Sequence, residues 1–169
     1  MFSAFATLMH RYSGQDEICV GVGIANRRWR ETEGLIGMIV NNVVMRMELS
    51  GSPAFRELLS QVRQVTLEAY AHQDVPFAKV VKALKVKRDP SQNPIYQVMF
   101  GFHDSPLLDL EFSDFTVDLH EGLSNGSAKF DMNVVVIPYA EQHVGQDTKA
   151  RSDGITIIWE YNTDLFDDT

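Results

Sequence analysis

Cysteine is almost absent from the sequence, and so are long apolar runs. Cys19 is the single cysteine among 169 residues, so the chain cannot form an internal disulfide, and its composition agrees with a reducing cytoplasm. No apolar run approaches the roughly 18 residues that indicate a membrane-spanning helix. The first apolar residues are not preceded by the basic segment of a signal peptide. We therefore expect a cytoplasmic chain with no membrane partner.

Positive charge is also scarce. The chain has 15 lysine and arginine residues against 23 aspartate and glutamate residues, for a net charge of −8. Because binding to phosphate backbones needs a basic face, we expect no nucleic-acid partner. One basic run stands out, and it comprises Lys79, Lys82, Lys85, Lys87 and Arg88. It fits either a solvated helix face with favourable cations near its C-terminal end or a docking patch for an acidic partner.

The motifs of common catalytic and metal centres are missing. The five histidines show no metal-ligand spacing, and the sequence has no H-E-x-x-H, paired C-x-x-C, G-x-S-x-G or P-loop stretch. The G-V-G of residues 21–23 lacks a third glycine and lies inside an apolar run, so it does not indicate a dinucleotide site. We expect no metal and no directly bound cofactor, and we interpret Cys19 as a small packed residue.

Periodic apolar residues predict three helices. The first covers residues 2–12 and stops near Ser13-Gly14. The second starts at Ser52-Pro53, with a capping hydroxyl followed by proline, and continues to residue 69. The third has apolar residues at 77, 80, 81 and 84, and we predict Asp74 as its N-cap and Pro76 in its first turn.

Alternating or continuous apolar stretches predict the strands. The strand at 18–25 has one bulky and one small face, which lets another element approach closely. Residues 35–47 predict a buried strand with a break at Asn41-Asn42. Further predicted strands are 95–102, 115–120, 132–138 and 155–161, and polar loops cover 26–34 and 140–153. Helices among apolar strands indicate an α/β fold, a two-layer lobe in which helices pack on a mixed sheet.

Two pairs of polar residues invite a functional interpretation. His72 and Asp74 are either an acid–base pair or a corner between two helices, where the dipole favours a cation after the first helix and Asp74 caps the second. Asn41 and Asn42 lie in an apolar stretch, and buried amides need partners. They mark either a bulge or strand-to-strand hydrogen bond, or an amide that points into a substrate channel.

Three stretches together resemble one family. L-I-G-M-I-V-N-N-V-V-M-R, A-H-Q-D-V-P-F and R-D-P-S-Q-N-P-I-Y-Q-V-M-F are similar to the later motifs of nonribosomal peptide synthetase condensation domains, in the same order and at similar spacing. The resemblance spans nearly all 169 residues. The family commonly has F-V-N-T where this chain has I-V-N-N at residues 39–42. The positions carried over as tunnel-lining or motif residues are Gly37, Asn41, Asn42, Arg46, His72, Gln73, Asp74, Pro76, Phe77, Arg88, Asn93 and Pro94.

The resemblance implies a chloramphenicol acetyltransferase-like fold, in which two lobes meet around a tunnel. Carrier proteins bearing phosphopantetheine present donor and acceptor thioesters from opposite ends, and a peptide bond forms. The family's catalytic motif, H-H-x-x-x-D-G, is absent from this sequence. Residues 1–169 therefore resemble the C-terminal lobe without the N-terminal lobe. We expect no catalytic residue in this chain and no activity without the missing lobe. The expected partners are the N-terminal lobe, donor and acceptor carrier proteins and an adenylation domain.

Other functions remain open at this level. Within the family, the resemblance favours peptide elongation over epimerisation or heterocyclisation. The chain could also be a non-catalytic module that recruits carrier proteins, or a complete acyltransferase that uses His72 across a homo-oligomer interface. Residues 103–128 correspond to the family's crossover onto the other lobe.

Overall fold

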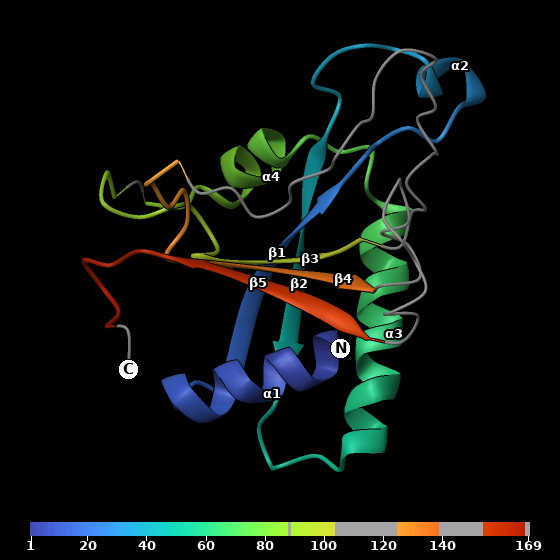
Figure 1. The fold of residues 1–169 in the computed structure, drawn as a ribbon. Helices are drawn as coiled ribbons and strands as arrows, with labels where there is room; N and C mark the ends of the chain where they lie inside the picture. The colour runs from blue at the N-terminus through green and yellow to red at the C-terminus, as the bar shows by residue number, and fades with distance from the viewer. Residues whose placement is uncertain (88, 104–124, 139–153, 168–169) are drawn as a thin grey trace. The chain divides into compact units, whose positions relative to one another are not determined.

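The computed structural model describes residues 1–87, 89–103, 125–138 and 154–167 (Figure 1). Five strands form one sheet in the order β2-β1-β3-β4-β5. β1 pairs with β2 antiparallel and with β3 parallel, and β4 pairs with β5 antiparallel. The predicted mixed sheet is thus confirmed. The chain divides into two compact units, Met1–Met99 and Phe100–Thr169.

The first unit contains all the helices that the structure describes, together with three strands. Its elements are α1 (Phe2–Ser13), β1 (Glu17–Ile24), α2 (Arg30–Glu33), β2 (Asn41–Glu48), α3 (Phe55–Ala71), α4 (Phe77–Leu84) and the start of β3 (Val98–Phe102). α1 contacts β1 and α3, while both α3 and α4 contact β2. Phe5 of α1 and Leu58 of α3 are buried with Val20, Met45 and Met47 of the two strands. These apolar residues form the core of the unit.

The second unit is built on β4 (Met132–Pro138) and β5 (Ile155–Tyr161). Val134 faces Trp159 in the antiparallel register, and the N–H of His103 donates a hydrogen bond to the carbonyl of Val136 at 2.9 Å. Val134, Val136 and Phe100 are buried. The predictions of strands at 132–138 and 155–161 are therefore confirmed.

The first predicted helix is confirmed together with its stop signal. α1 ends at Ser13, and Gly14 follows in the left-handed conformation with φ of 67°. Its N–H donates to the carbonyl of His10 at 2.9 Å. Glycine adopts this conformation without the steric cost of a side chain, which explains why the helix ends there. The sequence spacing predicts that Phe2, Phe5, Leu8, Met9 and Tyr12 share one apolar face of this helix, and this is only partly correct because Tyr12 is exposed.

Residues 35–40 contradict the predicted strand. β2 begins at Asn41, whose partner Ile24 is the last residue of β1, so the preceding six residues have no strand to pair with. Ile36 and Met38 are 105% and 89% exposed. The two asparagines are therefore the first residues of the strand and do not interrupt it.

Other element boundaries differ from the predictions for local reasons. The predicted polar loop 26–34 contains the short helix α2. α3 begins after Ala54, whose N–H donates to Glu57 Oε2 at 2.9 Å, so Ser52 is not the cap. β3 begins at Val98 because Ile95 has a φ of 74°, which is not extended. The predicted strand at 115–120 and the loop at 140–153 lie outside the described residues. No helix in the described ranges is long and apolar enough to cross a membrane.

Candidate functional site: the corner between two helices

Asn41 connects the start of β2 to the corner between α3 and α4. Its Nδ2 donates hydrogen bonds to the carbonyls of Gln73 and Val75, both at 2.8 Å. Its Oδ1 accepts one from the N–H of Phe77 at 3.1 Å. One amide side chain thus satisfies two turn carbonyls and the first N–H of α4. Because a helix leaves its first N–H groups without intrahelical partners, Asn41 acts as a cap supplied from a distant strand.

Asp74 does not cap α4, which corrects the sequence-based prediction. The N-cap position of α4 is occupied by Pro76, whose side chain makes no capping hydrogen bond. Asp74 Oδ2 instead lies 2.7 Å from Arg28 Nη1, and both side chains are exposed. The carboxylate therefore ties the corner to the segment after β1. An exposed ion pair of this kind typically stabilises a protein by about 0.2–1 kcal/mol.

Asn42 makes a second connection, to Tyr96. Its Nδ2 donates to the Tyr96 hydroxyl at 2.9 Å. Tyr96 is 2% exposed, and its ring centroid lies 5.3 Å from that of Phe77, at the start of α4. Burial raises the pKa of Tyr96, and the hydrogen bond from Asn42 partly opposes that change. The hydroxyl therefore stays protonated at neutral pH and serves as a buried hydrogen-bonding group.

A tight turn directs Tyr96 into this position. The N–H of Tyr96 donates to the carbonyl of Pro94 at 2.9 Å, and the intervening Ile95 has a φ of 74°. This is the pattern of a γ-turn, which is strained for a β-branched residue. Gln97 Nε2 donates to the Asn93 carbonyl at 2.9 Å and supports the same turn. Asn93 and Pro94 thus act by positioning Tyr96.

The Tyr96 ring lies directly against the backbone of Gly21 in β1. A Cβ added at Gly21 would be 2.3 Å from Tyr96 Cε2, so only glycine allows this approach. The small face predicted for this strand is therefore confirmed, and the approaching group is the Tyr96 ring.

His72 lies at the C-terminal cap of α3, as the corner interpretation predicted. Its backbone N–H donates to the carbonyl of Ala69 at 3.2 Å, and its side chain is exposed. Within the described part of the chain, its imidazole makes no hydrogen bond or ion pair with Asp74 or any other residue. Gln73 Nε2 donates to the Tyr70 carbonyl at 2.9 Å. An acid–base catalyst needs a positioned partner or substrate contact, and the corner offers His72 no such partner.

Gly37 and Arg46 lie apart from this cluster. Gly37 is in the exposed 35–40 segment, where its carbonyl accepts a hydrogen bond from Arg27 Nη2 at 3.4 Å. Arg46 Nη2 lies 2.7 Å from Glu17 Oε2, across the β1–β2 pair. This arginine holds the pKa of the Glu17 carboxyl below its usual value. Arg88 lies outside the described residues.

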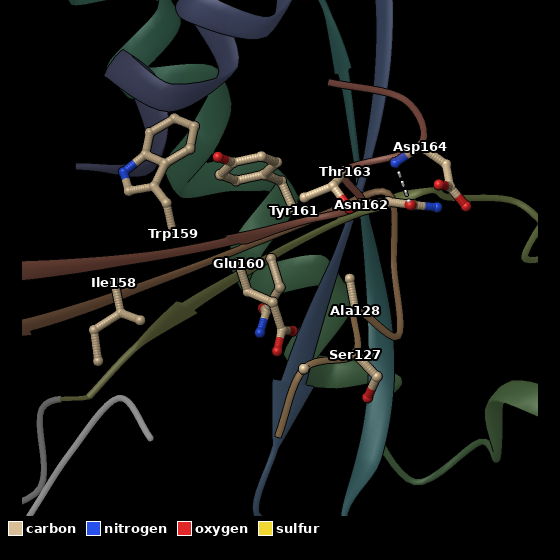
Figure 2. A pocket seen from close by; sticks show the side chains of 11 residues that line it. Ser127, Ala128, Ile158, Trp159, Glu160, Tyr161, Asn162, Thr163 and Asp164 are labelled. Atoms are coloured by element: carbon tan, nitrogen blue, oxygen red, sulfur yellow. Dashed lines mark hydrogen bonds between the residues drawn. The ribbon is translucent and has the colours of Figure 1, made fainter. Parts of the chain in front are cut away.

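The second unit contains a separate pocket of about 660 Å³. Figure 2 shows Trp159 and Tyr161 on one side of β5 and Ile158 and Glu160 on the other. Among the described residues, Glu160 and Asp164 contribute carboxylates to the lining, and no lysine or arginine does. This charge pattern disfavours a phosphate-bearing ligand. No described motif residue lines the pocket, and the described ranges contain no group of three or more potential metal ligands.

The family model for the condensation domain matches residues 1–169. This chain belongs to the condensation domain family. A linear gramicidin synthase from Brevibacillus parabrevis is 42% identical over 168 residues, which are 99% of this chain and 2% of that protein. A surfactin synthase from Bacillus subtilis (strain 168) is 35% identical over 166 residues, which are 98% of this chain and 4% of that protein. The chain thus spans a small part of the length of these relatives.

Solved structures show the same fold. A four-domain nonribosomal peptide synthetase bound to AMP and glycine matches with a TM-score of 0.78 and 22% identity, over 99% of this chain and 13% of that chain. The X-domain from teicoplanin biosynthesis matches with a TM-score of 0.77 and 23% identity, over 98% and 36% of the two chains. The fold class and the family resemblance are therefore both confirmed.

Two residues that organise this cluster, Gly21 and Tyr96, cannot be identified from the sequence. The sequence indicates Gly21 only as part of a small strand face and contains Tyr96 only within a longer motif. The alternation of small residues in β1 was a signal for close packing, but it could not identify the ring that approaches. Arg28, the partner of Asp74, lay in a predicted polar loop and gave no signal.

Proposed function

We propose that this chain is the C-terminal lobe of a condensation domain that forms peptide bonds between carrier-bound aminoacyl and peptidyl thioesters. The observation that carries this proposal is the match of the family model to residues 1–169 in a sequence with no H-H-x-x-x-D-G motif. Its exposed His72 has no described side-chain partner, which argues against a replacement catalytic centre. The lobe therefore supplies a tunnel wall and a carrier docking surface, and it is inactive alone.

In the proposed reaction, the amine nitrogen of the acceptor attacks the carbonyl carbon of the donor thioester. The C–N bond forms, the C–S bond breaks, and the amine loses a proton while the phosphopantetheine sulfur leaves as a thiol. Holding the two substrates in the correct geometry speeds the reaction, because their translational freedom is already lost on binding, before the chemical step. Proton transfer and stabilisation of the oxyanion would come from the histidine motif of the N-terminal lobe.

The described contacts support a positioning role for this lobe. Asn41 and Asn42 use their amides to hold α4 and Tyr96, so their side chains set the shape of the wall and are not free to bind substrate. The proposed partners are the N-terminal lobe, donor and acceptor carrier proteins and a neighbouring adenylation domain, all in the cytoplasm. Phosphopantetheine enters as the carriers' prosthetic group, and we propose no cofactor bound directly to the lobe.

Replacement of His72 by alanine tests this assignment in the intact condensation domain, with both lobes and both carrier proteins loaded. We expect the wild-type domain to form peptide on the acceptor carrier and the His72→Ala variant to retain kcat within about twofold, because the imidazole has no described partner. Peptide product is measured over time by mass spectrometry, with the melting temperature as a folding control. A loss of kcat above 100-fold at an unchanged melting temperature would assign the chemistry to His72.

A further inference from the structure

Positive charge in this acidic chain is concentrated on and just after α4. Five of the 15 basic residues lie between positions 79 and 88, and no acidic residue lies between Asp74 and Asp89. The rest of the chain has ten basic residues against 23 acidic ones. We call the described members of this run, Lys79, Lys82, Lys85 and Lys87, the α4 ridge. All four are exposed, and none has a described ion-pair or hydrogen-bond partner for its side chain.

Helix electrostatics explain only part of the α4 ridge. Lys79 is the third residue of α4, in the first turn, where the helix dipole favours an anion. Lys82 follows three positions later, so the two like charges are neighbours on the helix surface and repel each other. Lys82 occupies the last turn and Lys85 is the C-cap, where the dipole favours cations. Lys79 therefore remains as a first-turn cation that the helix dipole does not favour.

Apolar side chains are exposed just before α4 and at its last residue, and the helix is firmly held. Val75 is 43% exposed just before α4, and Leu84 is 62% exposed at its end. The three hydrogen bonds of Asn41 fix the start of α4 to β2, and Figure 1 shows α4 as a short helix beside the start of β2. Exposed apolar residues beside unpaired cations are typical of a surface that binds another protein.

We propose that the α4 ridge is a docking surface for an acidic carrier protein bearing phosphopantetheine. Charge complementarity favours an anionic partner for the four exposed lysines, and among the proposed partners a carrier bears the anionic phosphodiester of its phosphopantetheine. The α4 ridge attracts that partner to a chain that is otherwise strongly acidic, and Val75 and Leu84 provide apolar contact. This inference rests on the proposed function, since it names the surface used by that function's partner.

Direct binding tests the inference independently of turnover. The intact condensation domain is titrated with a phosphopantetheinylated carrier protein of the same synthetase, labelled for fluorescence anisotropy, at low and high salt. We expect the double variant Lys79→Glu, Lys82→Glu to raise Kd about tenfold and to flatten the salt dependence, since several exposed charge pairs are lost. The double variant Lys79→Gln, Lys82→Gln changes the charge by half as much, and we expect it to raise Kd about threefold. This milder variant keeps the test valid if the glutamate variant fails to fold.

The matched control is Arg56→Glu, Arg63→Glu on α3, which changes the net charge equally at two exposed helical positions. We expect it to leave Kd within twofold of the wild type. An equal effect of both double variants, an unchanged Kd in both ridge variants, or no binding by the wild type would overturn the inference. Peptide formation from soluble thioesters without carrier proteins reports on the proposed function separately, because that reaction needs no docking.

Discussion

Replacement of Gly21 by alanine is expected to lower the free energy of unfolding by about 3 kcal/mol, near the upper end of typical overpacking costs. The added Cβ would lie 2.3 Å from Tyr96 Cε2 and 2.6 Å from two more ring carbons. The ring cannot swing away easily, because it is 2% exposed, hydrogen-bonded to Asn42 and packed near Phe77. Urea denaturation of the wild type and the variant measures the difference.

Gly23→Ala is the matched control in the same strand. A Cβ at Gly23 meets its nearest atom, Met99 Cε, at 3.8 Å, which is ordinary contact. We expect this variant to be neutral or slightly more stable, since alanine is more restricted than glycine in the unfolded chain. Equal changes in the free energy of unfolding for the two variants would contradict the close packing of Tyr96 against β1. Combining Gly21→Ala with Tyr96→Ala should cost less than the two single changes added together.

Asn41→Ala is expected to lower the free energy of unfolding by about 2 kcal/mol. The variant loses three hydrogen bonds at once, and each contributes about 0.5–1.5 kcal/mol, less where water can replace the amide. It also leaves the Phe77 N–H without its cap. Hydrogen exchange measures the loss of this cap locally. The Phe77 amide should exchange faster, while amides in the middle of α3 should change only as much as the drop in global stability predicts.

Two further variants separate the roles of the Asn41 amide. Asn41→Asp keeps an acceptor for the Phe77 N–H, and its charge suits a helix N-terminus, but it loses the donor to the carbonyls of Gln73 and Val75. We expect protection of Phe77 to be retained and the corner to loosen. Gln73→Ala, which removes only an exposed side-chain hydrogen bond, should change stability by less than about 0.5 kcal/mol. Equal effects of Asn41→Ala and Gln73→Ala would contradict the capping role.

The element types were predictable because the spacing of apolar residues differs between helices and strands. The helices α1, α3 and α4 and the separate strands β4 and β5 all follow from that signal. The strand predicted for residues 35–40 was wrong because an apolar sequence is not enough to form a strand. β1 ends at Ile24, so this segment has no strand to pair with. Periodicity describes a segment alone and contains no information about its partners.

The corner shows the same limit at the level of single residues. Local rules predicted Asp74 as the cap, because aspartate is a favoured N-cap residue close before a helix. The structure supplies the cap from Asn41, 36 positions earlier in the sequence than Phe77, and leaves Asp74 to pair with Arg28. A long-range hydrogen bond of this kind leaves no local pattern. The motif resemblance nevertheless placed Asn41, Gln73 and Phe77 in one set, and the structure brings those three together.

The central claim, that this lobe forms part of a peptide-bond-forming enzyme and contributes no catalytic group, is tested most directly by turnover with and without the other lobe. Peptide formation from loaded donor and acceptor carriers is measured for the 169-residue chain and for the intact condensation domain under identical conditions. The account predicts product from the intact domain and only uncatalysed aminolysis from the chain alone. Multiple turnovers by the isolated chain, abolished by His72→Ala, would contradict it.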